Sequence, residues 1–164
     1  MRRTILTALA VTVLAGLGAV PANAQWAEEE EAKAAAMEVI TGLFDAMRAA
    51  DSAAVRAAFH SDVQIASSFS NGEGVAGVQY GEIEGFVQGV GGAAHGDWDE
   101  QVGETELRAY DNLVTAAMPY VFNFKGEVSH CGVNTFQIGK IGEEWKVVGI
   151  IDTRRTEGCG EWLD

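Results

Sequence analysis

The sequence predicts a single α+β domain in which N-terminal helices pack on one face of a curved antiparallel sheet. Two observations lead to this fold class. Helical patterns are concentrated in the first part of the chain, whereas the last third holds several strand patterns separated by short turns. The 164 residues are 48% hydrophobic, which is enough for one packed core, and the chain is too short for two comfortable domains.

The longest predicted helix covers residues 26–50. Four consecutive glutamates stand near its start, where negative charge suits the helix dipole, and apolar residues then recur at helical spacing. Asp51 or Ser52 is expected to cap a second, short helix that ends at Phe59. A third helix is predicted over residues 83–90.

Strands are predicted over residues 63–69 and over most of the last third. The later strands cover residues 102–110, 114–124, 128–138 and 145–153. Every second residue from Val114 to Phe124 is apolar, as a half-buried strand requires. Pro119 cannot donate to a ladder, so an edge or a bulge is expected there. Residues 91–99 are expected to form an exposed loop.

The first 24 residues have the features of a secretory signal peptide. Arg2 and Arg3 precede an apolar run, and Ala22-Asn23-Ala24 fits a cleavage site of small residues. The apolar run is about one turn short of the roughly 20 residues that a membrane span needs. We therefore expect export to the periplasm or the medium, no membrane association after cleavage, and a mature domain of residues 25–164.

The net charge of −13 argues against two classes of partner. Nucleic-acid binding needs clustered Lys and Arg, and an anionic membrane surface would repel this chain. The pattern Gly72-x-Gly74-x-x-Gly77 matches a dinucleotide-binding fingerprint, but no good helix follows it, so a flexible turn segment is expected.

No metal or cofactor is expected either. The three histidines lack the spacing of a zinc pair. The acidic stretch with His95, Asp97, Asp99 and Glu100 lacks the pattern of a calcium loop and is predicted to be a solvated loop.

The chain contains two cysteines, Cys131 and Cys159. In an oxidising compartment an even number of cysteines permits a disulfide. The spacing does not reveal whether the two Cβ atoms meet, so a disulfide and two separate thiols are both compatible with the sequence.

The order of the elements resembles the nuclear transport factor 2-like superfamily over residues 36–155. The likeness is carried by residues 57–62 (Ala-Ala-Phe-His-Ser-Asp), by residues 120–132 with Tyr120 and His130-Cys131-Gly132, and by residues 145–155. It implies a cone-shaped α+β fold. The last two segments look most like the branch labelled lumazine-binding.

Ketosteroid isomerases belong to the same superfamily, so their catalytic positions can be compared with this sequence. An ungapped alignment places Leu43 and Ser67 where those enzymes carry their tyrosine and their aspartate. An aliphatic side chain cannot donate to an oxyanion, and a serine without a base partner cannot carry a proton at neutral pH. The isomerase mechanism is therefore not transferred to this chain.

Four residues are candidates for polar contacts in a cavity between the helices and the sheet: Tyr120, His130, Asp152 and Arg154. Strand alternation places His130 among apolar residues and beside Gly132, which leaves room. Asp152 and Arg154 share one face and can pair or orient a polar ligand. Each also fits a structural role, as a core histidine, a solvated ion pair or a core aromatic.

Three functions are compatible with these features. The first is the binding of a small, partly apolar or aromatic molecule in the cone. The second is an isomerase, dehydratase or cyclase reaction that uses His130 with Asp152, which requires their side chains to come within hydrogen-bond reach, directly or through one water. The third is an interaction module whose outer sheet face forms a homodimer.

Overall fold

A computed structural model describes residues 22–70, 73–160, 162 and 163. The predicted signal peptide therefore lies outside the described residues, apart from its last three positions. The helices are α1 (Ala22–Ala49), α2 (Ser52–Ala58) and α3 (Ile83–Gly91). The strands are β1 (Phe59–Ser70), β2 (Ala76–Gly81), β3 (Trp98–Val102), β4 (Glu106–Tyr110), β5 (Leu113–Phe124), β6 (Glu127–Ile141) and β7 (Glu144–Arg154). Within the described ranges, no helix is long and apolar enough to cross a membrane.

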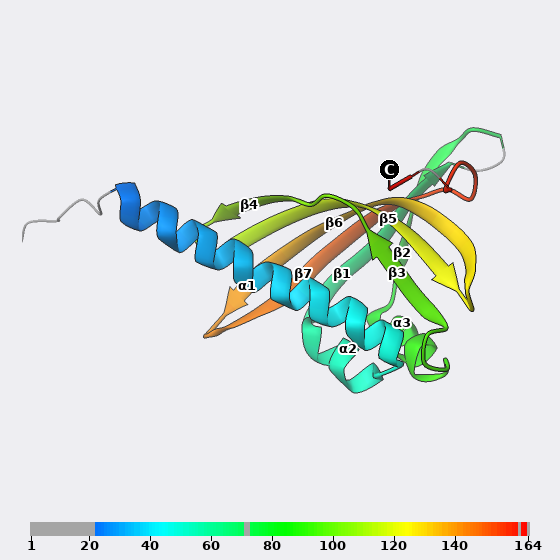
Figure 1. Cartoon of the computed structure of the whole chain (residues 1–164), viewed down its shortest axis with the longest axis horizontal. Coiled ribbons are helices and arrows are strands. Elements are labelled where there is room, and N and C mark those ends of the chain that lie inside the picture. Colours follow the sequence, from blue (N-terminus) through cyan, green and yellow to red (C-terminus); the bar gives the residue numbers. More distant parts are fainter. Residues whose placement is uncertain (1–21, 71–72, 161, 164) are drawn as a thin grey trace, which may run out of the picture.

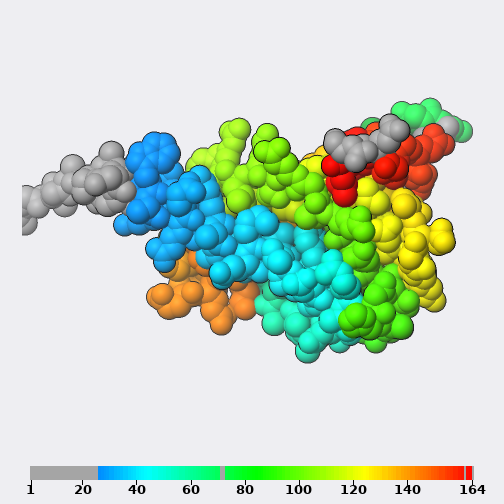
Figure 2. Space-filling model, viewed as in Figure 1, coloured from blue at the N-terminus to red at the C-terminus, as the bar shows by residue number. Residues whose placement is uncertain are grey.

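All seven strands belong to one sheet, in the order β2-β1-β7-β6-β5-β3, with β4 also paired to β5. Figure 1 shows the sheet curving over α1, with α2 and α3 at one end. In Figure 2, α1 and α2 lie across the sheet, and the β6–β7 turn emerges beyond them. The predicted class, helices on a curved sheet in an α+β domain, is confirmed.

The sheet departs from the prediction in one pairing. β1 runs parallel to β7, so the sheet is mixed rather than antiparallel. Short turns join β5 to β6 and β6 to β7 and force these neighbours to be antiparallel. Most of the chain lies between β1 and β7, so no hairpin joins them. These two strands can therefore pair in parallel, which a short turn between them would not allow.

The core lies between α1 and the concave face of the sheet. Ile40, Leu43 and Met47 of α1 are buried there. The alternation predicted for β5 is confirmed from Val114 to Tyr120, where every second side chain is buried. Burying one large apolar side chain stabilises the folded state by about 1.5–3 kcal/mol. The buried face of α1 therefore contributes more to the stability of this helix than the helix propensities of its residues do.

The N-terminus of α2 is capped as predicted. The Asp51 carboxylate accepts a hydrogen bond from the backbone N–H of Ala54 at 2.9 Å. The helix ends one residue earlier than expected, because β1 begins directly at Phe59. His60, Ser61 and Asp62 therefore belong to a strand and not to the end of a helix.

Two glycine-containing segments differ from their predictions. The expected turn segment includes β2, which pairs with β1 in a hairpin. Of the strand predicted over residues 102–110, only Val102 and residues 106–110 are in strands, at the end of β3 and in β4, and β3 begins within the loop predicted over residues 91–99. Between β3 and β4, the N–H of Gly103 donates to the Pro119 carbonyl at 2.9 Å. Pro119 itself pairs regularly with Val133, and the bulge of this ladder lies in β6, where Ser129 is the extra residue opposite Phe122 and Asn123.

Gly132 in β6 permits an unusually close approach of β7. A Cβ atom at this position would collide with the carbonyl oxygen of Thr153. The Thr153 hydroxyl also accepts a hydrogen bond from the N–H of Val133 at 2.9 Å. Any side chain at position 132 must therefore displace the backbone of β7.

Gly132→Ala is expected to lower the free energy of unfolding by about 3 kcal/mol or more, because a backbone clash cannot be relieved by a rotamer change. Gly42→Ala is the matched control, since Gly42 is an exposed position of α1 where an added methyl group would have no neighbour within 4 Å. That control should be stabilised by about 0.5–1 kcal/mol. Urea denaturation checks both values, and equal stability of Gly132→Ala and the wild type would contradict the packing argument.

Candidate ligand-binding site

A cavity of about 460 Å³ lies between the helices and the concave face of the sheet. Most of its wall is apolar. Leu43, Phe44 and Met47 come from α1, Phe86 comes from α3, and Phe136 comes from β6. The volume falls within the range of about 300–1,000 Å³ that is usual for small-molecule sites.

A chain of aromatic contacts stiffens one side of this cavity. Phe59 meets Phe86 at a centroid distance of 6.0 Å, and Phe86 meets Trp98 at 5.7 Å. Trp98 in turn meets Phe122 at 5.4 Å. All three pairs are edge-to-face, the geometry that the ring quadrupoles favour. The contacts tie α3 to β1, β3 and β5, so the wall is formed before any ligand arrives.

Polar side chains are gathered on the strand side of the cavity, around Asp152. The Tyr120 hydroxyl donates to Asp152 Oδ2 at 2.8 Å, and it also lies 3.2 Å from the Thr153 carbonyl oxygen. Arg154 donates to the same Asp152 oxygen from Nε at 3.2 Å and from Nη2 at 3.0 Å. Three of the four predicted site residues therefore form one hydrogen-bonded group.

The protonation of this group follows from its surroundings. Burial raises the pKa of Tyr120, and the hydrogen bond to Asp152 and the charge of Asp152 raise it further, so the hydroxyl stays a donor. The Asp152 side chain is 9% exposed and the Arg154 side chain 49%. The ion pair is thus buried on its acidic side and open on its basic side, unlike the fully solvated pair that the sequence also allowed.

His130, the fourth predicted residue, lines the same cavity but does not join the Asp152 group. Its Nδ1 lies 3.0 Å from the Ser129 hydroxyl, and its ring contacts Tyr120 and Phe122. Burial, followed by the nearby Arg154 charge, lowers the pKa of His130 to about 4. The imidazole is therefore neutral at pH 7. Among the described residues, no direct hydrogen bond joins His130 to Asp152, although both line the cavity and the charge of Asp152 acts on the imidazole.

Glu100 and Asn134 are cavity residues that the sequence does not predict as site residues. Glu100 is predicted in a solvated loop, but it lies on β3, half-buried, and lines the cavity. The Asn134 amide, which is 3% exposed, donates to Glu100 Oε1 at 2.5 Å. The signal that reveals Glu100 is the alternation of Trp98, Glu100 and Val102, which places Glu100 on the same strand face as Trp98. Its neighbour Asp99 pairs instead with Arg48 of α1, at 2.7 Å.

The Glu100 carboxyl group has an unusual acidity. Burial raises its pKa, the hydrogen bond from Asn134 lowers it, the charge of Asp152 raises it, and the charge of Arg154 lowers it. The net result is a pKa of about 7 instead of 4.5. The cavity therefore contains two carboxyl groups in different environments: Asp152, which is paired with an arginine, and Glu100, which is about half protonated at neutral pH.

The remaining sequence motifs do not form a site. Gly77 lies within β2 and packs against Phe69, so the glycine pattern belongs to a hairpin and not to a strand-to-helix turn. Gly72 lies outside the described residues. In the part of the chain that the structure describes, no three His, Cys, Asp or Glu side chains are arranged to hold a metal ion.

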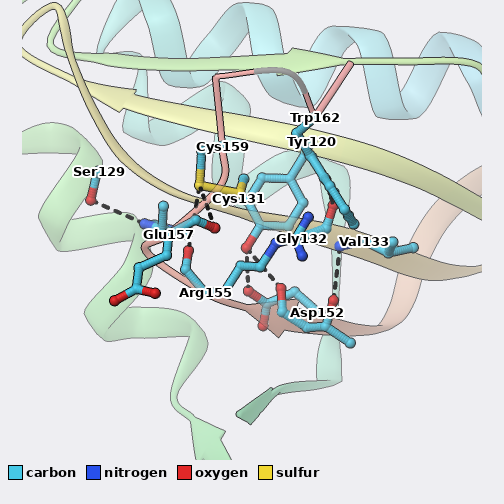
Figure 3. The surroundings of a disulfide bond; sticks show 12 residues. Tyr120, Ser129, Cys131, Gly132, Val133, Asp152, Arg155, Glu157, Cys159 and Trp162 are labelled. Carbon is cyan, nitrogen blue, oxygen red and sulfur yellow. Dashed lines mark hydrogen bonds between the residues drawn. A yellow bond between two sulfur atoms is a disulfide. The ribbon is translucent and has the colours of Figure 1, made fainter. Parts of the chain in front are cut away.

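Cys131 and Cys159 are joined in a disulfide (Figure 3). Strand alternation directs Cys131 to the side of the sheet opposite its neighbour His130, which lines the cavity. Trp162 extends this attachment, because its indole N–H donates to the Gly132 carbonyl at 2.6 Å and Arg155 stacks over its ring at 3.4 Å. The backbones of Cys131 and Arg155 also exchange two hydrogen bonds. The C-terminal segment thereby holds the end of β7 against β6.

Replacing both cysteines by alanine is expected to lower the free energy of unfolding by about 3 kcal/mol, because the unfolded chain regains the entropy of a loop spanning 28 residues. Urea denaturation with and without a reducing agent measures this. Reduction should destabilise the wild type and leave the double variant unchanged. A wild-type midpoint that does not respond to full reduction would contradict the prediction.

No protein-family model matches the chain, and no curated protein sequence matches it. Solved structures do match. A nuclear transport factor 2-like protein of unknown function from Shewanella baltica has 15% identity and a TM-score of 0.57, over 85% of this chain and 100% of that one. The chain has a nuclear transport factor 2-like fold.

Two further structures share this fold. A protein of unknown function with a cystatin-like fold from Nostoc punctiforme has 14% identity and a TM-score of 0.58, over 76% of this chain and 92% of that one. The beta subunit of a protein assigned as an aromatic-ring-hydroxylating dioxygenase, from Novosphingobium aromaticivorans, has 12% identity and a TM-score of 0.61, over 77% and 91%. At these identities the likeness concerns the fold and not the activity.

The raised pKa of Glu100 makes folding stability depend on pH. The folded state binds the proton more tightly than the unfolded state, so this contribution is fully present below pH 4.5 and is lost as the pH rises through 7. Glu100→Gln removes the titration. Relative to the wild type, the variant should gain up to about 3 kcal/mol between pH 4.5 and pH 8.

Urea denaturation of both proteins across this pH range measures the difference. Glu104→Gln, which alters an exposed carboxyl group in the loop after β3, is the control and should show no such gain. A stability difference between Glu100→Gln and the wild type that is constant with pH would show that Glu100 has an ordinary acidity.

Proposed function

We propose that this protein binds a small, largely apolar molecule in the cavity between α1, α3 and the concave face of the sheet. The observation that carries the proposal is the hydrogen-bonded group of Tyr120, Asp152 and Arg154 at the strand side of an apolar cavity. An apolar wall supplies affinity, and a few fixed polar groups orient the bound molecule.

The cavity is organised in advance for binding. Asp152 Oδ2 already accepts from Tyr120 and Arg154, so these side chains are fixed without a ligand. The aromatic contacts from Phe59 to Phe122 fix a further part of the wall. Pre-formed sites bind more tightly because less side-chain entropy is lost on association.

The alternatives from the sequence have less support. The enzyme hypothesis requires His130 and Asp152 to act together, yet His130 is directed to Ser129 and Asp152 to Tyr120 and Arg154. The likeness to the lumazine-binding branch rests on sequence segments alone. We therefore describe the ligand by its chemistry, an apolar or aromatic body with one polar end, and not by a name.

We also propose that the protein acts outside the cytoplasm. The features of residues 1–24 support export, and the Cys131–Cys159 disulfide is of a kind that persists in oxidising compartments. The homodimer predicted from the sequence stays a prediction, with exposed apolar residues such as Leu113 and Ile151 as the surface that would be tested.

Filling the cavity should abolish binding. Ser67 lines the cavity, whereas Ser68 is directed to the other face of β1. Ser67→Trp should weaken the binding of the neutral fluorescent probe N-phenyl-1-naphthylamine by at least about tenfold, which is ~1.4 kcal/mol. Ser68→Trp is the matched control and should change the affinity by less than about twofold.

Fluorescence titration of the purified protein gives the dissociation constants, and circular dichroism confirms that both variants fold. Equal affinity of the wild type and a folded Ser67→Trp variant would place the binding elsewhere. If neither the probe nor any member of a broad panel of apolar molecules binds the wild type, the proposed function is wrong.

A further inference from the structure

The two carboxyl groups of the cavity offer different hydrogen-bonding atoms to a ligand. Asp152 receives all its recorded hydrogen bonds on Oδ2, from Tyr120 and from two nitrogens of Arg154. Its charge is neutralised by the guanidinium group at 3.0 Å. The Asp152 group is therefore largely satisfied within the protein and has little to offer an incoming charge.

Only one of the two carboxyl oxygens of Glu100 has a hydrogen-bond partner among the described residues. Oε1 accepts the amide hydrogen of Asn134, whereas Oε2 has no hydrogen-bond partner among the described residues. No buried side-chain nitrogen or oxygen in the described part of the chain lacks a partner, so Oε2 must be accessible. Because Glu100 lines the cavity, this accessible oxygen is available to a ligand.

We infer that the cavity selects an uncharged ligand whose polar end is a carbonyl oxygen, and that this oxygen accepts a hydrogen bond from the Glu100 carboxyl group. The inference rests on the proposed function and specifies its ligand class. Asn134 is the positioning residue, because its amide fixes one carboxyl oxygen and leaves the other to carry the proton.

The groups around Glu100 favour its protonated form. From β5 it faces the neutral Tyr120 hydroxyl, and from β6 it faces Asn134 and the neutral His130. From β7 it faces Asp152 and Arg154, whose opposite charges act on it with opposite signs. The resulting pKa of about 7 means that the carboxyl group is a hydrogen-bond donor below neutral pH.

The helices add no compensating charge next to Glu100. The cavity residues from α1 are Leu43, Phe44 and Met47, and the one from α3 is Phe86. Glu82 also lines the cavity, from the exposed residue just before α3, and it adds negative charge only. Arg48 of α1 is committed to Asp45 and Asp99.

A charged ligand would fit this environment poorly. An anion would meet the Asp152 carboxylate and would have to compete with it for the Arg154 guanidinium group. A cation would have to displace the proton of Glu100 and lose its own hydration in an apolar cavity. A carbonyl group needs only a donor, and the protonated Glu100 supplies one without any net change of charge.

The experiment compares two probes with the same aromatic body, 2-acetylnaphthalene and 2-naphthylmethylamine. Isothermal titration calorimetry is run at pH 5.5 and at pH 8.5 on the whole purified protein. Because the pKa of Glu100 is about 7, most of its carboxyl group is deprotonated at pH 8.5 and can no longer donate. The affinity for the ketone should therefore fall by up to about thirtyfold from pH 5.5 to pH 8.5. The amine should bind more weakly than the ketone at pH 5.5.

Two variants locate the effect. Glu100→Gln keeps an N–H donor without a titration, so it should bind the ketone about equally at both pH values. Glu104→Gln removes an exposed carboxyl group outside the cavity and should retain the pH dependence of the wild type. Circular dichroism at each pH confirms that every protein is folded.

Three results would overturn the inference: ketone binding that does not change with pH in the wild type, a pH dependence that persists in Glu100→Gln, or tighter binding of the amine at pH 5.5. If N-phenyl-1-naphthylamine binds but the ketone does not, the ligand class is wrong while the cavity function stands. If neither these three probes nor the broad panel of apolar molecules binds, the proposed function fails and the inference fails with it.

Discussion

The absence of a side chain at Gly132 is the constraint on which the polar part of the cavity depends. Gly132 pairs with Tyr120 in the β5–β6 ladder, and the carbonyl of Thr153 occupies the space that a Cβ atom would take. With that space open, the Tyr120 hydroxyl reaches across β6 and bonds to Asp152 at 2.8 Å. A larger residue in β6 would move β7 outward and separate Asp152 from its donor, so one backbone contact determines the geometry of the whole group.

The electrostatic character of the cavity follows from this contact. Asp152 is paired with Arg154, and the charges of both still reach the neighbouring titratable groups. Burial and the positive charge of Arg154 lower the pKa of His130 to about 4, while burial and the charge of Asp152 raise the pKa of Glu100 to about 7. The raised pKa of Glu100 thus follows chiefly from its burial, and Glu100 has no ion pair of its own such as the one that Arg154 makes with Asp152.

Strand alternation is sufficient to predict the residues that act within a single strand. It places Tyr120 on the buried face of β5 and Asp152 with Arg154 on one face of β7, which the structure brings together. It cannot predict the contact of Glu100 with Asn134, because these residues come from β3 and β6, with β5 between them. The position of Glu100 in the cavity is not predicted for a second reason. The charged residues and glycines around it are typical of loops, and β3 has only five residues, too few for strand alternation to be recognised against that composition.

The C-terminal end of β7 is kept in place by two features. One is its parallel pairing with β1, and the other is the disulfide that follows it. The regular β6–β7 ladder stops at the pair Asn134 and Asp152, and pairing resumes only at Cys131 and Arg155. Arg154 lies in the gap between these two anchors, where no ladder bond to β6 fixes it. On one side, its neighbour in β1 is Phe69; on the other, the disulfide holds the chain that follows it. The backbone of Arg154 is thus held by β1 on one side and by the disulfide-anchored segment that follows it on the other, while its guanidinium group is held by Asp152.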